Sequence, residues 1–441
     1  MTPPRRPRVL ILAEAANPEM VSVPLVGWSL AEALRSVADI HLVTQSRNRE
    51  AILRAGWVEG RDFTIIDSER VARPLWRLTN LLGVGASSGK GWTVSQAISV
   101  LSDAYFDRVA WKTLGARVKA GEWDIVHRVT PLSPIKPSRF GRRAASAGVP
   151  FVMGPLNGGV PWPAGYERQR GKEREWLSKL RGAVRLIPGR RATWRAASAI
   201  LVGSRHTGSE VVADCQHKVI YIPENGINPD RFPSSAVSKR SEGPLRACFV
   251  GRLVPYKMPD LLIEAAAPLL ASGKMRLDVI GNGPMLQELQ EMVRQKELTS
   301  QVTFHGFLPH TEVAQAMRDC DVLTFPSIRE FGGGVVLEAM ALGLPPLVVD
   351  YAGPGELVDS AIGYKIPICR ADELAVRLRA TLEQIVMNPA VLSELSQAAK
   401  NRVHEKFLWS RKAEQISDVY AWVLGGRPDK PEPFPMDRDQ G

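Results

Sequence analysis

A chain of 441 residues, 44% of them hydrophobic, is long enough for two α/β domains and supplies two hydrophobic cores. No apolar run approaches about 18 residues, so we predict no membrane-spanning helix, and the apolar run after the basic N-terminus is too short for a signal peptide. The four cysteines lie far apart, without disulfide or metal-ligand spacing. These features favour a cytoplasmic protein with free thiols and no metal site.

The net charge of +11 is concentrated in the first half of the chain, and residues 164–197 are the most basic stretch. A one-sided basic domain attracts anionic partners. No nucleic-acid-binding motif accompanies the charge, so we expect no nucleic-acid partner. We favour peripheral contact of the first domain with the anionic inner face of the plasma membrane. A basic surface without a dedicated partner is the alternative.

Short β-branched runs alternate with segments of helical period, which is typical of repeated β-α-β units and doubly wound parallel sheets. In chain order, the first strand series is predicted at 8–13, 40–44, 63–67, 124–129, 150–153, 200–203 and 219–223, with a helix at 28–36. A Pro/Ser/Gly-rich stretch at 228–244 predicts a linker. The second series follows at 246–251, 276–280, 302–305, 322–325 and 347–350, with helices at 259–271, 285–296 and 410–424.

The strongest chemical signal is the run from Glu330 to Gly343, in which Glu330 and Glu338 stand eight positions apart. Glu330 follows a predicted strand, and Gly332, Gly333 and Gly334 then open a predicted helix that holds Glu338. Glycines at a helix start let an anion approach the backbone N–H groups, where the helix dipole favours negative charge. The pattern predicts a phosphate-bearing ligand whose hydroxyls are bound by the two carboxylates.

A second signal is the loop Gly251-Arg252-Leu253-Val254-Pro255-Tyr256-Lys257. It follows the first strand of the second series, and open α/β sheets bind ligands at the carboxyl ends of their strands. Two cations in such a loop suit a diphosphate leaving group.

In this order and spacing, the two motifs resemble the GT-B-fold retaining glycosyltransferases of family 4. Residues 221–232 (YIPENGINPDRF), 304–307 (FHGF) and 407–420 extend the resemblance, which is weaker before residue 200. It implies two Rossmann-like domains that face a central cleft: an acceptor-side domain at 1–228 and a nucleotide-sugar-binding domain at 229–407. A closing helix at about 408–424 would cross back to the first domain. The proline- and charge-rich tail at 425–441 is predicted to be disordered.

The resemblance implies transfer of a sugar from a nucleotide-diphosphate donor, such as a UDP- or GDP-sugar, without a metal or other cofactor. The acceptor would be a saccharide or lipid-linked saccharide in cell-surface polysaccharide or glycolipid biosynthesis. The catalytic roles carried over are those of Glu330 and His127 at the transferred sugar and of Arg252 and Lys257 at the diphosphate. The donor-binding positions carried over are Gly27 (in the loop after the first strand), Gly251, Gly281, Phe307 and Leu308 (at the nucleobase), Gly332, Gly333, Gly334, Val335, and Glu338 (at the ribose).

Some residues depart from this pattern or admit a plainer interpretation. The family usually has glycine where Met258 stands, and without the resemblance His127 would more often be a structural histidine. Asp319-Cys320-Asp321 is predicted to be a turn and not a metal site. Residues 154–163 (GPLNGGVPWP) predict a loop that covers the cleft and touches the acceptor, or a plain surface loop.

Two other functions were weighed against the transferase. A dinucleotide-dependent oxidoreductase is disfavoured because the Gly-x-Gly-x-x-Gly fingerprint is missing. A catalytically silent sugar-nucleotide-binding protein of the same fold is the main alternative. The presence of both glutamates and both cations argues against that loss of activity.

Overall fold

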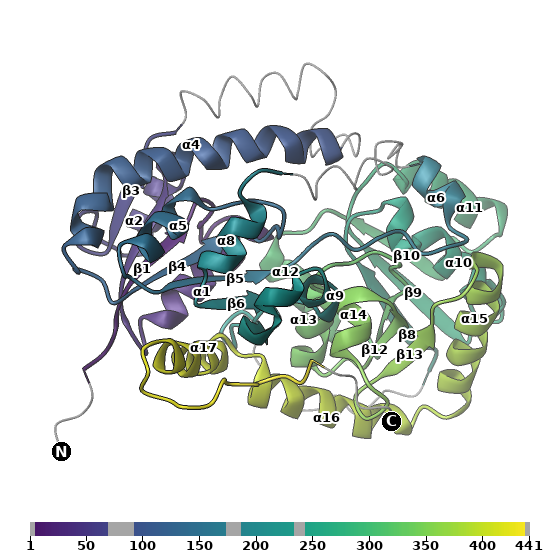
Figure 1. Cartoon of the computed structure of the whole chain (residues 1–441). Coiled ribbons are helices and arrows are strands. Elements are labelled where there is room, and N and C mark those ends of the chain that lie inside the picture. Colours follow the sequence, from purple (N-terminus) through teal and green to yellow (C-terminus); the bar gives the residue numbers. More distant parts are fainter. Residues whose placement is uncertain (1–4, 69–91, 173–186, 233–242, 437–441) are drawn as a thin grey trace. The chain divides into compact units, whose positions relative to one another are not determined.

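A computed structural model describes residues 5–68, 92–172, 187–232 and 243–436. By their internal contacts these residues form two compact units (Figure 1). Unit 1 comprises the described residues of Met1–Gly159, Leu177–Glu224 and Trp409–Gly441. Unit 2 comprises those of Val160–Trp176 and Asn225–Leu408.

Unit 1 is built on a parallel sheet of seven strands in the order β3-β2-β1-β4-β5-β6-β7. The strands are β1 (Arg8–Ala13), β2 (Asp39–Gln45), β3 (Phe63–Ile66), β4 (Ile125–Thr130), β5 (Phe151–Leu156), β6 (Ala199–Val202) and β7 (Val219–Tyr221). Most of them are buried on both faces, which explains why their sequences are continuous apolar runs without alternation.

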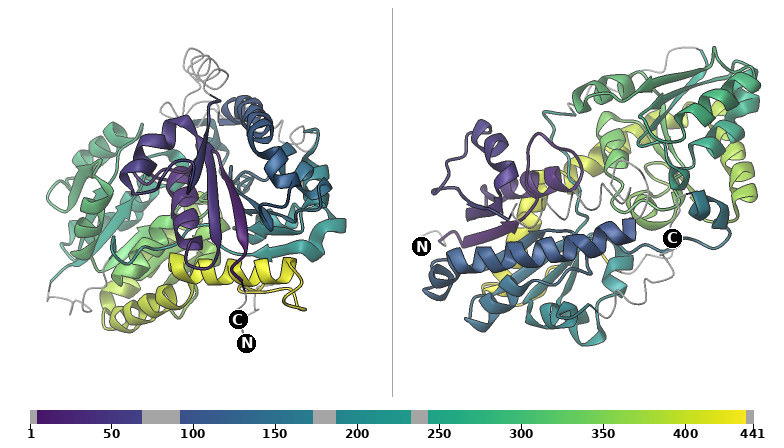
Figure 2. Two further views of the ribbon diagram at one scale, coloured as in Figure 1. Left: turned by 90° about the vertical axis from the view of Figure 1, so that its left-hand side faces the viewer. Right: turned by 90° about the horizontal axis from the view of Figure 1, so that it is seen from above.

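Helices cover both faces of this sheet, and the views of Figures 1 and 2 show α4 (Trp92–Lys119) and α17 (Trp409–Val423) on opposite sides of the strands. The alternation of side chains along β4 agrees with this placement: His127 reaches Tyr420 of α17, whereas Arg128 interacts with Asp107 of α4. The other helical segments are α1 (Val23–Leu34), η1 (Ser46–Asn48), α2 (Arg49–Arg54), α5 (Arg139–Ser146), α8 (Arg190–Ala196), α9 (Arg205–Ser209) and η3 (Ala213–Lys218).

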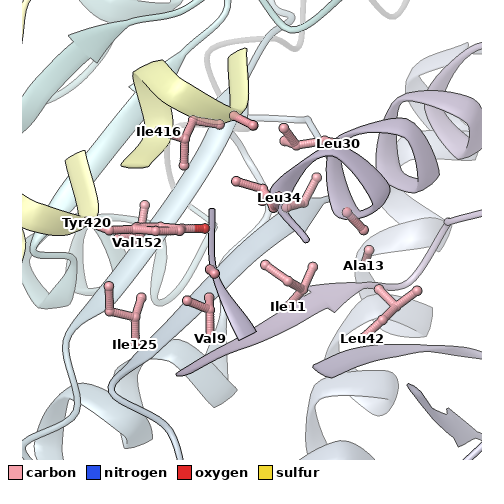
Figure 3. Packing of buried hydrophobic residues seen from close by; sticks show 14 of the residues in the cluster. Val9, Ile11, Ala13, Leu30, Leu34, Leu42, Ile125, Val152, Ile416 and Tyr420 are labelled. Carbon is pink, nitrogen blue, oxygen red and sulfur yellow. The ribbon is translucent and has the colours of Figure 1, made fainter. Parts of the chain in front are cut away.

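The main core of unit 1 lies between β1, α1 and α17, and Figure 3 shows their side chains meeting. Ile11 of β1, Leu34 of α1 and Ile416 of α17 are each fully shielded from solvent. Burying one such side chain contributes about 1.5–3 kcal/mol. The apolar stripe of the last helix therefore fastens the C-terminal part of the chain to the N-terminal sheet.

Unit 2 contains a parallel sheet of six strands in the order β10-β9-β8-β11-β12-β13. The strands are β8 (Leu245–Val250), β9 (Met275–Ile280), β10 (Val302–Gly306), β11 (Val322–Phe325), β12 (Pro346–Asp350) and β13 (Tyr364–Pro367). The helical segments are α6 (Glu167–Lys172), η4 (Pro255–Lys257), α10 (Pro259–Ala271), α11 (Leu286–Gln295), α12 (His310–Arg318), α13 (Gly334–Leu342), α14 (Ala352–Leu357), α15 (Ala371–Met387) and α16 (Val391–Lys406). The sequence did not predict β13, a short edge strand with only one buried residue.

Several predicted boundaries differ from the structure. The compact units change over at Glu224/Asn225, four residues before the predicted boundary, and residues 160–172 belong to unit 2 although they lie within the predicted first domain. Residues 160–172 pack with distant residues of unit 2, and the local sequence gives no sign of these long-range contacts. Helix α1 begins at Val23, with a proline in its first turn, earlier than the predicted start.

The described part of the C-terminal tail is packed and not disordered as predicted. Phe434 is 9% exposed, and its ring lies 5.7 Å from that of Tyr221. Arg205 Nε donates to the Met436 carbonyl at 3.0 Å, and Lys430 Nζ donates to the Val219 carbonyl at 3.3 Å. One apolar anchor and these bonds hold residues 425–436 against unit 1, despite their unfavourable composition. Among the described residues, none of the helices combines the length and hydrophobicity needed to cross a bilayer.

Candidate functional site

The candidate site lies at the topological switch point of unit 2. Strands β9 and β10 extend from β8 in one direction, while β12 and β13 extend from β11 in the other. Loops that follow β8 and β11 therefore diverge at the carboxyl edge of the sheet, where α/β folds bind ligands. Gly251 and Arg252 follow β8, and Glu330 follows β11.

Lys257 and Glu330 meet at this edge, as the sequence predicted for a common site. The Lys257 ammonium contacts the Glu330 carboxylate, and their side chains are only 12% and 22% exposed. Lys257 Nζ also lies 4.7 Å from the centre of the Phe325 ring. Burial is the largest single influence and acts to lower the pKa of Lys257. The charges of Glu330 and Tyr256 and the hydrogen bond to Glu330 together outweigh it, so the pKa is raised and the amine stays protonated.

Hydrogen bonds to backbone carbonyls fix the two loops that carry this pair. The Tyr256 carbonyl accepts from Ile328 N–H at 2.9 Å and from the Ser327 hydroxyl at 3.3 Å. Asn225 Nδ2 donates to the Gly332 carbonyl at 2.9 Å, on the far side of Glu330. The loop that presents Glu330 is thus tied down at both ends.

The predicted glycine-opened helix is α13, which begins at Gly334. Gly333 is its N-cap, with φ 56° and ψ 37°, a left-handed conformation that glycine adopts without strain. The first turn of α13 follows, with half-buried Val335 in it, and Val336 N–H donates to the Gly333 carbonyl at 2.9 Å. The first N–H groups of a helix have no intrahelical partner of the usual kind. Glu338 lies one turn further along the same helix and is half-buried.

The remaining predicted site residues of unit 2 occupy loops at the same edge of the sheet. Arg252 is exposed after β8, and Phe307, 77% exposed, and half-buried Leu308 follow β10. Gly281 follows β9 with φ 140°, and a Cβ at this position would overlap the Gly251 carbonyl oxygen. Gly281 therefore allows the loop after β9 to pack closely against the loop after β8. This packing role differs from the donor-binding role that was predicted.

Met258, which stands where the family pattern has glycine, has a glycine-like backbone. Its φ is 54° and its ψ is 41°, and its side chain is 1% exposed. A residue with a Cβ pays about 1–2 kcal/mol for this conformation. Burial of the methionine side chain offsets that cost.

His127 and Gly27, the two predicted site residues of unit 1, both take part in the internal packing of that unit. His127 is fully buried, with Nδ1 2.7 Å from the Tyr420 hydroxyl and Nε2 2.8 Å from the Gly154 carbonyl. Because a carbonyl only accepts, Nε2 carries the proton and Nδ1 accepts from Tyr420. Burial lowers the pKa of His127 to about 4. With both nitrogens engaged, the ring matches the structural interpretation and not the predicted contact with a sugar.

Gly27 lies inside α1 and not in the loop after the first strand. A Cβ there would overlap the Ala15 carbonyl oxygen, so the glycine lets α1 pack closely against the segment that follows β1. Its predicted approach to the reaction centre is not seen within unit 1.

The described residues contain no cluster of His, Cys, Asp or Glu suited to a metal ion. In the predicted turn at 319–321, the Asp321 carboxylate accepts a hydrogen bond from Arg246 N–H at 2.8 Å. That bond, between residues 75 positions apart, gives Asp321 a structural role.

Three residues beside the site were not predicted: Asn225, Arg329 and Trp162. Asn225 lies in the YIPENG motif, whose sequence predicted only a domain entry. Arg329 is adjacent to Glu330, and Trp162 belongs to the loop at 154–163. Their roles depend on contacts between distant segments, for which the sequence contains no periodic signal.

Comparison with known proteins places the residues of the site in a family. Residues 230–402 match the family model described as glycosyl transferases group 1. The 2-deoxystreptamine glucosyltransferase of Streptomyces kanamyceticus is 30% identical over 244 residues, which cover 52% of this chain and 62% of that protein. The D-inositol 3-phosphate glycosyltransferase of Rhodococcus erythropolis is 31% identical over 229 residues, which cover 50% of each protein. Residues 230–402 belong to the glycosyl transferases group 1 family.

The predicted residues of unit 2, from Gly251 to Glu338, all lie in this family segment, whereas Gly27 and His127 lie outside it. The matches span only about half to three-fifths of the length of these curated relatives. Among solved structures, Anabaena Alr3699/HepE in complex with UDP is similar with a TM-score of 0.62 and 17% identity, over 94% of this chain and 100% of that chain. This likeness, together with the two parallel-sheet units, confirms the predicted GT-B fold.

Proposed function

We propose that this protein is a retaining glycosyltransferase that moves a sugar from a nucleotide-diphosphate donor to a saccharide or lipid-linked saccharide. The observation that carries the proposal is the Lys257–Glu330 pair at the switch point of a group 1 glycosyl transferase segment, followed by the glycine-opened helix α13. The UDP in the Alr3699/HepE structure supports a nucleotide-sugar donor, such as a UDP- or GDP-sugar.

The chemistry of the residues supports this reaction. Breaking the bond between the sugar and the diphosphate leaves an oxocarbenium-like sugar and places negative charge on the departing oxygen. Lys257 and Arg252 supply positive charge, and the first turn of α13 supplies N–H groups, in a setting that needs little reorganisation. Glu330 holds Lys257 protonated and provides a carboxylate for a sugar hydroxyl. Glu338 provides a second carboxylate for a hydroxyl of the nucleotide.

The acceptor side and the cellular setting follow from unit 1. We propose that unit 1 binds the acceptor and that its excess of basic residues draws the protein to the anionic inner face of the plasma membrane. The pathway would be that of a cell-surface polysaccharide or glycolipid. The basic residues described on the outside of α4 and α5 include Arg108, Lys112, Arg139 and Arg143. The described residues cover only part of the basic stretch at 164–197.

The catalytic assignment is tested by Glu330→Gln and Lys257→Ala in the full-length protein. The donor is first found by measuring thermal stabilisation with a panel of nucleotide sugars. Each substitution should lower turnover by about 10²–10³-fold, because it removes a charge from the site where charge develops. Glu291→Gln, at a carboxylate on α11 whose side chain is 47% exposed, is the matched control and should leave turnover unchanged. Turnover that is unaffected by both site substitutions would show that the assignment is wrong.

Two further measurements test the parts of the proposal that concern metal and membrane. Activity should persist in EDTA, and a strict requirement for manganese would contradict a metal-independent mechanism. Binding to anionic vesicles should occur at low salt and be lost at high salt, since the Debye length falls from about 30 Å at 0.01 M to about 3 Å at 1 M. No binding at low salt would remove the membrane from the proposal.

The alternative is a sugar-nucleotide-binding protein without catalytic activity. It would bind a donor in the thermal panel yet show neither transfer nor donor hydrolysis with any acceptor offered. The retention of Glu330, Glu338, Arg252 and Lys257 favours the enzyme.

A further inference from the structure

The described residues 160–172, which we call the arm, begin directly after Gly159 of unit 1 but pack within unit 2. Contacts at three places fasten the arm to unit 2. The Tyr351 hydroxyl donates to the Pro161 carbonyl at 3.1 Å, and the Tyr166 hydroxyl donates to the Cys369 carbonyl at 2.8 Å. Lys172 Nζ pairs with Glu288 at 2.8 Å. Tyr166 is 1% exposed, so the arm is an integral part of unit 2.

The first residues of the arm contact Arg329, the residue next to Glu330. Arg329 is 6% exposed, and its Nε donates to the Val160 carbonyl at 3.2 Å. Its guanidinium carbon lies 5.2 Å from the ring centre of Trp162 and 5.9 Å from that of Phe331. Cation–π attraction to nearby aromatic rings helps to hold a buried guanidinium, and it strengthens when the pair is desolvated.

Trp162 also contacts the second loop of the site. Its ring meets that of Tyr256 edge to face, with 6.5 Å between centres and an angle of 82° between planes. Tyr256 directly precedes Lys257, and its carbonyl accepts the hydrogen bond from Ile328 N–H. One indole ring thus touches a neighbour of each member of the Lys257–Glu330 pair.

We propose that Trp162 and Arg329 are positioning residues that hold Glu330 and Lys257 in their reactive arrangement. The inference rests on the proposed glycosyltransferase function. The arm acts as a brace: Trp162 contacts Arg329 beside Glu330 and Tyr256 beside Lys257, so that the two loops keep their spacing. Glycines follow Glu330, and such a backbone does not hold its own conformation. A displacement of about 1 Å at a reacting group can cost about 10²-fold in rate.

Substitutions at Trp162, Arg329 and Lys172 distinguish positioning of the Lys257–Glu330 pair from mere attachment of the arm to unit 2. Trp162→Ala removes the contacts to both loops, whereas Trp162→Phe keeps an aromatic face for the guanidinium. Arg329→Lys keeps the charge but removes the planar group and its Nε bond. Lys172→Ala is the matched control, because it breaks an exposed ion pair at the other end of the arm.

The experiment measures kcat and KM for the donor identified by the thermal panel, using the full chain. It also measures backbone hydrogen exchange of residues 327–333 without any ligand. Trp162→Ala and Arg329→Lys should each lower kcat about ten- to a hundredfold, with donor KM changed less than threefold, and should speed exchange in this loop. Trp162→Phe should recover most of kcat, and Lys172→Ala should match the wild type in both measurements.

The outcomes distinguish the brace from the proposed function. Unchanged kcat and exchange in Trp162→Ala would overturn the brace, as would equal losses in Trp162→Ala and Lys172→Ala. A loss of kcat without faster exchange in the loop would also overturn it. If the wild type turns over no donor, the proposed function fails, while the exchange measurement still decides whether Trp162 holds the Glu330 loop.

Discussion

Met258 allows a sharp test of the backbone that presents Lys257. At φ 54° and ψ 41° it occupies the left-handed region, and its side chain is 1% exposed. Two opposing effects therefore act at one position. Truncating a buried methionine to alanine costs about 2–5 kcal/mol. The left-handed backbone costs any residue with a Cβ about 1–2 kcal/mol, and glycine escapes that cost.

Both Met258→Ala and Met258→Gly should therefore destabilise the protein, but the glycine variant should be the more stable of the two. Glycine regains about 1–2 kcal/mol of strain and loses about 0.4–1 kcal/mol through its greater freedom in the unfolded chain. As the N-cap of α10, the position also favours glycine over alanine. We expect a net advantage of about 1 kcal/mol for glycine.

The assay is urea unfolding followed by circular dichroism and tryptophan fluorescence. The control is Ala380→Gly, at an exposed position within α15, where the same exchange should destabilise by about 1 kcal/mol. The sign of the alanine-to-glycine effect should thus reverse between the two sites. If Met258→Ala were as stable as Met258→Gly, the left-handed backbone at this position would be refuted.

Three further predictions follow from buried groups and a close backbone approach. The pKa of His127 is about 4 in the folded protein against 6.5 in the unfolded chain, so the unfolded state binds the proton first as the pH falls. The stability of the wild type relative to His127→Gln should therefore drop by about 3 kcal/mol from pH 6.5 to pH 4, and a constant difference would contradict the buried neutral ring. Burial lowers the pKa of Lys412 from 10.5 to about 7, although Glu224 acts to raise it. The stability of the wild type relative to Lys412→Met should thus rise between pH 7 and pH 10.5, as urea unfolding at each pH would reveal. Gly281→Ala should destabilise the protein by about 2–4 kcal/mol, because the added Cβ would overlap the Gly251 carbonyl oxygen. Gly251→Ala is the comparison: there φ is 147°, and the nearest atoms to the added Cβ belong to the Lys257 side chain at 3.4 Å. Thermal unfolding in which Gly251→Ala is the more damaging of the two would refute that packing.

The sheets could be predicted from the sequence because parallel strands that are buried on both faces have continuous apolar sequences. Twelve of the strands were placed within a few residues, and Arg8–Ala13 and Val322–Phe325 were placed with the observed bounds. The edge strand Tyr364–Pro367 was missed because only one of its residues is buried. The carboxylates, cations and glycines of unit 2 could be named as candidate site residues because they lie in two short motifs that follow strands.

The histidine illustrates what a local pattern cannot decide. The same residue at the same place on β4 suits either a sugar contact or a core hydrogen bond. The structure favours the core hydrogen bond, because the hydroxyl of Tyr420, 293 positions away, is hydrogen-bonded to Nδ1 of His127. Gly27 and Gly281 are similar, since the carbonyl that each approaches belongs to another segment.

Local patterns in the chain were enough to predict two parallel sheets, the order of most of their strands along the chain, and the acidic and basic motifs of unit 2. Those properties are local, because side-chain period and strand-to-loop order are set by neighbouring residues. Folding in three dimensions was needed to show that residues 160–172 pack in unit 2, that Trp162 contacts both Arg329 and Tyr256, and that His127 is buried inside unit 1. These features depend on contacts between residues far apart in the chain, whose free energy is gained only when both partners are buried together.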